Sequence, residues 1–157
     1  MSKDIIIERA TLNDAESILM VQKEAFKSEG ELYKNKELPA LIESLDDVDK
    51  CFKATTIFVA KNSLDNIIGA IRGRVENNTC HISRLIVHPE FQMQGIGSRL
   101  LMVLEFHFSE IPCFELFTGS RSLRNIYFYE SHGYSEYRHK VINENLTIIY
   151  MRKNRRR

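Results

Sequence analysis

Two glycines stand where the sequence changes from a strand pattern to a helix pattern. Residues 92–98 read Gln-Met-Gln-Gly-Ile-Gly-Ser, and an amphipathic run follows directly. The first amides of a helix have no intrahelical partner, and the helix dipole adds partial positive charge there. Glycines let several such amides approach one anion without obstruction by side chains. This turn therefore predicts a site for a phosphate group.

Two familiar phosphate-binding motifs do not fit this turn. A P-loop needs GxxxxGK[ST], but no lysine follows Gly97. A dinucleotide-binding turn needs a third glycine where Leu100 stands. A lone GxG pair also occurs where two glycines simply ease a tight turn, so the pair alone leaves both interpretations open.

A strand before the turn and a helix after it must position these glycines. In Cys80–His88, Ile82 and Ile86 alternate with Leu85 and Val87, which is typical of a central strand that is apolar on both faces. Pro89 ends this strand because proline cannot donate to a ladder. The helix that follows carries an apolar face, formed by Leu100, Leu101, Val103, Leu104 and Phe108.

The rest of the chain also alternates between strand and helix patterns. We expect the order βααβββαβαββ, a mixed α/β domain, with a mobile polar loop at residues 29–36. The other expected strands are Asp4–Arg9, Thr55–Lys61, Ile67–Glu76, Cys113–Phe117, Tyr134–Ile142 and Leu146–Met151, and the other expected helices are 11–30, Glu37–Leu45 and Ser122–His132.

Two segments resemble a known family. Leu85–Leu101 resembles the acetyl-CoA signature of the GNAT superfamily of N-acetyltransferases, whose core [QR]xxGx[GA] is here Gln92-x-x-Gly95-x-Gly97. Asn125–Tyr134 is similar to the family's second motif, in which a helix ends FYExxGY. The motifs occur in the family's order with one strand between them, and the order of elements from residue 4 to 151 is similar as well.

The resemblance implies a fold and an activity. It implies one N-acetyltransferase domain over residues 1–151, with a central mixed, mostly antiparallel sheet flanked by about four helices. The implied reaction moves an acetyl group from acetyl-CoA, the cosubstrate, to a primary amine of a small molecule or peptide by direct attack, without a metal. Because dimers are common in the family, a homodimer is one assembly to test.

The resemblance also implies which residues bind the cosubstrate. The backbone of Leu85, Ile86 and Val87 would pair with the pantetheine arm like an added strand, and the amides of the turn would bind the pyrophosphate. The turn residues in this role are Gln92, Met93, Gln94, Gly95, Ile96, Gly97 and Ser98.

Asn125 and Tyr129 are four residues apart and share one face of their helix. In related enzymes the matching asparagine contacts the cofactor, and the tyrosine hydroxyl lies beside the thioester sulfur. Tyr129 would then donate a proton to the departing thiolate, since a phenol with a pKa of about 10 is protonated at neutral pH. The alternative is a purely structural aromatic residue, which is the role we expect for Phe128.

An amine acceptor must also lose a proton. With a pKa of about 10.4, only about one lysine-like amine in 10³ is neutral at pH 7. Glu76, at the end of the strand before the cofactor strand, and Glu24, on the first helix, are candidate bases, although each could be an ordinary solvated carboxylate. Holding amine and thioester in attack geometry could also supply much of the rate.

The formal net charge of +1 is unevenly distributed along the chain. Residues 1–50 carry 7 basic and 12 acidic side chains, and residues 152–157 carry five of the 22 basic ones. In the family the first two helices contribute to acceptor specificity, so this acidity favours a cationic acceptor such as a polyamine, an aminoglycoside or a lysine-bearing peptide. A solvated helix face would have the same composition. We expect the basic tail 152–157 to be a dispensable solvated terminus.

Composition argues against several other classes. The odd number and wide spacing of Cys51, Cys80 and Cys113 disfavour a disulfide framework and a CxxC metal site, and no histidine pattern indicates a metal. No apolar run approaches the roughly 20 residues of a membrane-spanning helix, and the N-terminus lacks a secretory signal. We therefore expect a cytoplasmic protein without a membrane partner.

Two alternatives remain beside the enzyme. One is a non-catalytic acyl-CoA-binding or regulatory module of the same fold, against which the presence of Tyr129 argues. The other is nucleic-acid binding through the basic tail, which the acidic body and the absence of interleaved aromatic residues disfavour.

Overall fold

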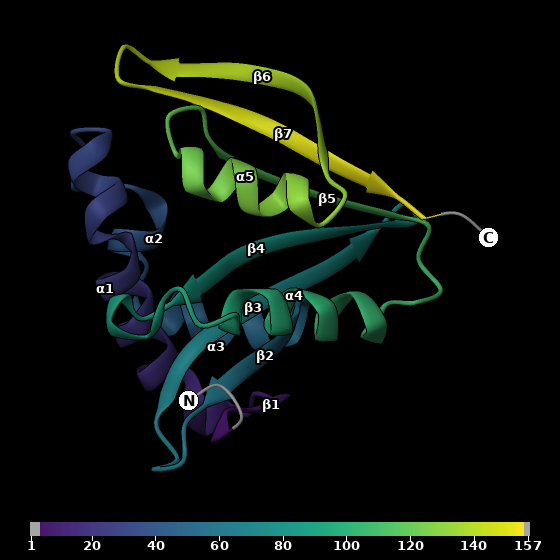
Figure 1. Ribbon diagram of the computed structural model, residues 1–157. Coiled ribbons are helices and arrows are strands. Elements are labelled where there is room, and N and C mark those ends of the chain that lie inside the picture. The colour runs from purple at the N-terminus through teal and green to yellow at the C-terminus, as the bar shows by residue number, and fades with distance from the viewer. Residues whose placement is uncertain (1–3, 156–157) are drawn as a thin grey trace.

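A computed structural model describes residues 4–155 of the chain, which form one seven-stranded sheet with helices on both faces (Figure 1). This confirms the expected mixed α/β fold. The strands are β1 Ile6–Arg9, β2 Thr56–Lys61, β3 Ile67–Glu76, β4 Thr79–Val87, β5 Cys113–Gly119, β6 Ser135–Asn143 and β7 Leu146–Asn154. The helices are α1 Ala15–Leu32, α2 Pro39–Ile42, α3 Leu45–Ala54, α4 Ile96–His107 and α5 Leu123–Ser131, with 3-10 turns at Leu12–Asp14 and Pro89–Phe91.

The sheet has the order β1-β2-β3-β4-β5-β7-β6 and divides at its one parallel pair, β4 and β5. These two strands pair only at their first residues, from Thr79–Cys113 to His81–Glu115. Beyond that junction β4 stays paired with β3, and β5 stays paired with β7. Each of the two strands therefore has an unpaired backbone edge that faces the gap between the two halves of the sheet, which separate in Figure 1.

Helices pack on both faces of the larger half of the sheet. Leu100 and Leu104 of α4 are completely buried in a cluster that includes Phe58 of β2. Ile18 of α1 is buried in a second cluster, which includes Val59. Successive strand residues point to opposite faces, so the neighbouring Phe58 and Val59 serve the two helices. Each fully buried side chain of this kind stabilises the fold by about 1.5–3 kcal/mol.

A β-bulge interrupts β4 close to the gap. One residue of β3, Ile71, is opposed by two residues of β4, Arg84 and Leu85, and Arg84 has a positive φ of 50°. The extra residue reverses the alternation of the strand. Ile82 therefore faces the α4 cluster and Ile86 the α1 cluster. The regular alternation expected from the sequence places Ile82 and Ile86 on the same face. The structure contradicts this expectation.

The helix expected at Glu37–Leu45 is wrong in extent. Between Glu37 and Ser44 only the four residues of α2 are helical, and a new helix, α3, starts at Leu45. Ser44 and Asp47 form a capping box, in which the Ser44 hydroxyl accepts from the Asp47 amide at 3.1 Å and the Asp47 carboxylate accepts from the Ser44 amide at 3.0 Å. This capping box starts α3 and separates it from α2.

Residues 29–36 form the expected polar loop only in part, since residues 29–32 are helical and residues 33–36 connect α1 to α2. Helix α1 continues to Leu32, and the Tyr33 side chain after it is only 2% exposed. Its ring lies so close to Gly119 of β5 that any Cβ at that position would overlap it. The segment thus anchors α1 to the smaller half of the sheet.

The chain segment 152–155 is part of the domain rather than a solvated tail. Strand β7 continues to Asn154, and Arg152 pairs with Glu115 of β5 at 2.6 Å. Lys153 pairs with the buried Glu105 of α4 at 3.1 Å. Arg155 lies over the Phe114 ring, 4.6 Å from its centroid. The domain boundary expected at residue 151 is therefore too early, because these charges have partners in the fold; residues 156 and 157 lie outside the described part.

Candidate functional site

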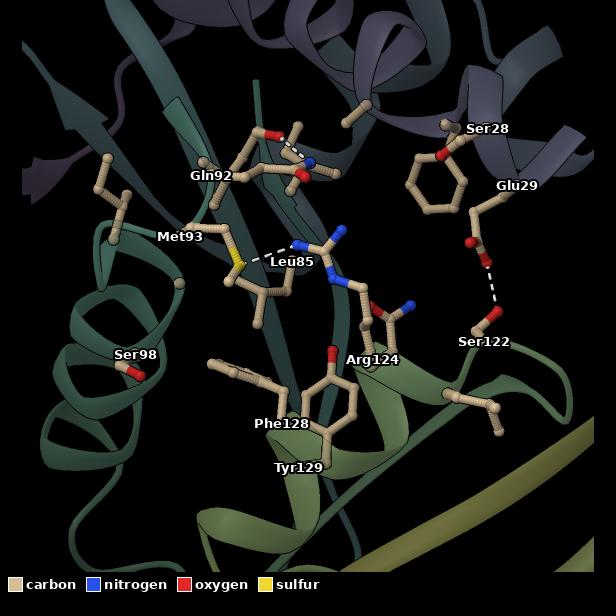
Figure 2. Close-up of a pocket in the computed structure, with 18 of the residues that line it drawn as sticks. Ser28, Glu29, Leu85, Gln92, Met93, Ser98, Ser122, Arg124, Phe128 and Tyr129 are labelled. Carbon is tan, nitrogen blue, oxygen red and sulfur yellow. Dashed lines mark hydrogen bonds between the residues drawn. The ribbon is translucent and has the colours of Figure 1, made fainter. Parts of the chain in front are cut away.

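A cavity of about 650 Å³ lies at the open end of the gap between β4 and β5. Helix α1, β4, the turn before α4, the segment after β5 and α5 all contribute to its walls (Figure 2). The lining residues are Ala25, Phe26, Ser28, Glu29, Leu32, Leu85, Ile86, Val87, Phe91, Gln92, Met93, Gly95, Ile96, Gly97, Ser98, Arg121, Ser122, Leu123, Arg124, Asn125, Phe128 and Tyr129.

The anion-binding turn predicted from the sequence forms one end of this cavity. Gly95 is the N-cap of α4 and has φ of 80°, in the left-handed region that favours glycine. Met93, two residues earlier, also has a positive φ, of 65°. A Cβ at Gly97 would touch the Phe128 ring at an ordinary 3.5 Å, so the fold itself leaves room for a larger residue there. We expect the glycine at this position to serve the approach of a ligand to the α4 amides.

Two polar side chains of the turn stabilise its shape. The Gln92 amide donates to the Val87 carbonyl at 3.1 Å, which ties the turn to the end of β4. The Ser98 hydroxyl and the His132 ring nitrogen are 2.9 Å apart, which links α4 to the end of α5. Gln94 is exposed and does not line the cavity, so of the turn residues named from the sequence its side chain is the one that lies outside the cavity wall; the role predicted for Gln94 concerns its backbone amide.

Tyr129 comes from α5 and is half-buried. Figure 2 shows its hydroxyl pointing into the cavity, in the direction of Leu85. Burial raises the pKa of Tyr129 above its ordinary value, so the phenol is protonated throughout the neutral range. Asn125, one turn earlier, also lines the cavity and donates to the Thr118 hydroxyl at 3.3 Å. The structure thus places both α5 residues that the motif singled out in the same cavity as the glycine turn.

Arg124 is a cavity residue that sequence reasoning missed. Its guanidinium extends from α5 to the turn before α4, where Nη2 lies 3.0 Å from the Met93 sulfur (Figure 2). A thioether is a weak acceptor, and a guanidinium has five N–H donors. Within residues 4–155 this is the one hydrogen bond that the Arg124 side chain makes, so most of its donors are available to an anion in the cavity.

Glu29 of α1 is a second missed residue, because only the fold brings it to α5. Its Oε1 accepts from the Ser122 hydroxyl at 2.6 Å, and Ser122 is in turn 2.7 Å from the Tyr33 hydroxyl. Position in the sequence gave no signal for this arrangement beyond the general acidity of the first third.

The two candidate bases named from the sequence do not line the cavity. Glu76 pairs with Thr79 at the end of the β3–β4 hairpin, whereas the cavity lies at the opposite end, near Val87. A hydrogen bond from Arg74, at 2.6 Å, lowers the pKa of Glu76, which makes it a weaker base. Glu24 is exposed and pairs with Lys27 at 2.9 Å. The geometry contradicts the expected placement of Glu76 because the hairpin carries it away from the gap.

Residues 4–155 offer neither a metal-binding cluster nor a membrane-spanning helix. They contain no cluster of three or more His, Cys, Asp or Glu side chains placed to hold a metal ion. None of their helices combines the length and the hydropathy that crossing a membrane requires.

The parallel pair β4–β5 splits beside the N-terminus of α4, and this combination suits an extended ligand that carries phosphates. Residues 53–136 match the family described as acetyltransferase (GNAT) domain. The match covers more than half of the chain, so the protein belongs to the GNAT acetyltransferase family.

Solved structures share this fold. PaiA N-acetyltransferase from Thermoplasma acidophilum, in complex with coenzyme A, superposes with a TM-score of 0.81 at 19% identity, covering 96% of this chain and 99% of that one. The ribosomal-protein-S18-alanine N-acetyltransferase from Escherichia coli gives a TM-score of 0.79 at 16% identity, covering 96% and 93% of the two chains. At such identities the likeness shows the fold alone.

A curated relative is similar in sequence over part of its length. UPF0157 protein YqkA from Bacillus subtilis is 27% identical over 122 residues, which are 78% of this chain and 35% of that protein. The chain thus spans about a third of the length of this relative.

Proposed function

We propose that the protein transfers an acetyl group from acetyl-CoA to a primary amine by direct attack. The observation that carries this proposal is one cavity that joins three features: the N-terminus of α4, the unpaired edge of β4 and the hydroxyl of Tyr129. A CoA thioester needs all three, because it combines phosphates, an amide-bearing arm and a sulfur leaving group.

The turn and β4 would hold the cosubstrate. The amides from Gln92 to Ser98 bind the pyrophosphate, and the free edge at Leu85–Val87 pairs with the amides of the pantetheine arm, as an added strand does. Arg124 leaves the Met93 sulfur and donates to a phosphate oxygen, since charge-assisted bonds are about twice as strong as neutral ones. Coenzyme A in the complex of the Thermoplasma relative supports this choice of ligand.

The chemistry requires one new bond and two proton movements. The neutral amine attacks the thioester carbon, the C–N bond forms, and the C–S bond breaks with its electron pair on sulfur. The amine nitrogen loses one proton and the sulfur gains one. With unperturbed pKa values of about 10 for a phenol and 8.5 for a thiol, complete transfer from Tyr129 to sulfur is uphill by about 2 kcal/mol. Tyr129 therefore acts mainly by donating a hydrogen bond while charge develops on the sulfur.

An amine acceptor is the class that the relatives support. The name of the Escherichia coli neighbour gives an alanine of a ribosomal protein as its substrate. The excess of acidic side chains in residues 1–50, 12 against 7 basic, favours a cationic acceptor by attraction at long range.

A thiol-release assay tests this proposal. Purified protein is mixed with acetyl-CoA and a panel of polyamines, aminoglycosides, amino acids and peptides, and free thiol is followed. We expect release that depends on at least one amine. Calorimetric binding of CoA without release by any amine would contradict the enzyme and favour the acyl-CoA-binding module.

A further inference from the structure

The Glu29 carboxylate is held at the cavity by a directed chain of hydrogen bonds. The Arg121 amide donates to the Tyr33 hydroxyl at 3.1 Å, and the Tyr33 and Ser122 hydroxyls are 2.7 Å apart. Ser122 then donates to Glu29 Oε1 at 2.6 Å. Since Ser122 uses its proton on Glu29, Tyr33 must donate to Ser122. Every donor in the chain thus points toward the carboxylate.

This row of hydrogen bonds orients the Glu29 carboxylate and leaves one of its oxygens without a donor. Tyr33 and Ser122 are 2% and 5% exposed, so the supporting hydroxyls are enclosed by protein. Within residues 4–155 the Glu29 side chain accepts one hydrogen bond, at Oε1, which leaves Oε2 for another donor. A preorganised carboxylate with one free oxygen at a cavity wall is suited to receive a cation.

Glu29 and the glycine turn occupy different ends of the cavity. Figure 2 shows Gln92 and Met93 on one side, Glu29 on the other, and the Tyr129 hydroxyl between them. With the phosphates at the turn and the thioester beside Tyr129, an acceptor has to enter from the side of Glu29.

The charged groups at that end include one carboxylate, and the donors of the nearby arginine are engaged elsewhere. Glu29 is the one carboxylate among the lining residues, which all belong to the described chain. Of the two lining arginines, Arg121 donates to the Leu32 and Asn145 carbonyls at 3.0 Å, and Arg124 extends to the turn. The walls near Glu29 also include the apolar side chains of Phe26, Leu32 and Leu123.

We propose that Glu29 receives the ammonium group of a primary alkylamine and takes one proton from it before the nitrogen attacks. This inference rests on the function proposed above and adds the acceptor class and the base. One ammonium proton moves to Glu29 Oε2, and the neutral nitrogen then attacks the thioester carbon. As the C–N bond forms and the C–S bond breaks, the nitrogen gives its second proton to water and the thiolate takes a proton from water. The Glu29 carboxyl later loses its proton to water as well. The apolar walls accommodate the alkyl chain next to the nitrogen.

Two acceptors of matched length test the role of Glu29. Pentylamine is almost entirely protonated at pH 7, whereas butanoic hydrazide is neutral there and needs no base before attack. We expect Glu29→Gln to lower kcat/KM for pentylamine by about 10²-fold, the usual contribution of a general base. The same substitution should leave the hydrazide rate unchanged. The carboxamide that Glu29→Gln introduces can still accept from Ser122, so CoA affinity and Tm should not change.

Two further variants complete this test. Ser122→Ala leaves Glu29 charged but releases it, and we expect a smaller loss that is again confined to pentylamine. Glu16→Gln removes a charge from the exposed start of the same helix and should behave as the wild type. Equal rates with pentylamine for the wild type and Glu29→Gln, or equal losses with both acceptors, would overturn the inference. If the wild type releases thiol with none of the amines in the panel, the proposed function itself would be refuted.

Discussion

At the scale of single residues, the site depends on a few groups whose surroundings suit their tasks. The Tyr129 phenol is half-buried, and desolvation raises its pKa, so it can donate a hydrogen bond at any pH near neutrality. Gly95 takes a left-handed conformation that a side chain would strain. These two residues make separable contributions, one to chemistry and one to binding.

Replacing Tyr129 by Phe should affect turnover more than binding. The substitution removes one hydroxyl and keeps the ring that packs near Phe128, at a centroid distance of 5.2 Å. We expect kcat to fall by about 10²-fold with CoA affinity unchanged. Steady-state thiol release and calorimetry measure the two quantities. An unaltered kcat would remove Tyr129 from the mechanism.

Replacing Gly95 by Val should affect binding. A β-branched residue at φ of 80° costs about 1–3 kcal/mol of strain, so the turn would leave this conformation and its amides would diverge. We expect CoA affinity to fall at least tenfold, which corresponds to about 1.4 kcal/mol. Calorimetric titration with CoA provides the measurement, and circular dichroism checks that the fold is retained. An unchanged Kd would refute the assignment of the pyrophosphate to this turn.

At the scale of elements, a buried charge cluster joins the α2–α3 connection to the sheet. Arg72 of β3 is 4% exposed and donates to Glu43 at 3.0 Å and to Gln22 at 3.1 Å. Arg84, at the β4 bulge, reaches the same Glu43 oxygen at 3.4 Å. The cluster thus ties α1, the α2–α3 connection, β3 and the bulge together beside the cavity.

Stability should depend on pH through Glu43. Burial acts to raise the pKa of Glu43, but hydrogen bonds from Arg72 and Gln22 and the charges of Arg72 and Arg84 outweigh it, so the pKa is lowered from 4.5. A depressed folded-state pKa stabilises the fold above the unfolded pKa, and this stability is lost as pH falls through the folded value. The free energy of unfolding of the wild type, measured in urea, should therefore decrease below a pH of about 4.5.

The variant Glu43→Gln isolates this contribution. It leaves the Arg72 charge buried without its counter-ion, which we expect to cost about 3 kcal/mol of unfolding free energy at pH 7. The difference from the wild type should shrink as the pH falls through the folded pKa of Glu43. Glu110→Gln, at an exposed position, is the matched control. A difference that stays constant down to pH 3 would contradict the electrostatic explanation.

Local patterns in the sequence predicted most elements, and contacts between distant segments account for the errors. The glycine turn and the α5 motif lie within short segments, so their residues could be identified before the fold was known. The bulge at Arg84 reverses a strand whose apolar residues fit either face. Glu29 and Arg124 reach the cavity only because α1 and α5 meet across the gap, which no local spacing reveals.

At the scale of the whole molecule, the two halves of the sheet are held together at one end and apart at the other. β4 and β5 pair at Thr79–Cys113, and β7 reaches this junction, where Asn154 pairs with Cys113. At the same end Glu105 of α4 accepts from Tyr134 at 2.7 Å and pairs with Lys153. The segment 152–155 therefore closes the end of the sheet opposite the cavity.

Removing residues 152–157 should destabilise the protein. Truncation leaves the buried Glu105 without Lys153 and takes three residue pairs from the β5–β7 ladder. Loss of the charge partner alone costs about 3 kcal/mol, which corresponds to a Tm lower by about 10 °C for a domain of this size. A chain ending at residue 155 is the control. Equal Tm values for the two truncations would show that the segment is dispensable after all.

Direct transfer of the acetyl group is the central claim, and isotope-labelled acetyl-CoA tests it most directly. The protein is incubated with cosubstrate carrying ¹³C in the acetyl group and an amine that supports thiol release, and products and protein are analysed by mass spectrometry. We expect one free thiol for each labelled amide and no label on the protein. Label held covalently by the protein, or CoA bound without any labelled amide, would contradict direct attack in this cavity.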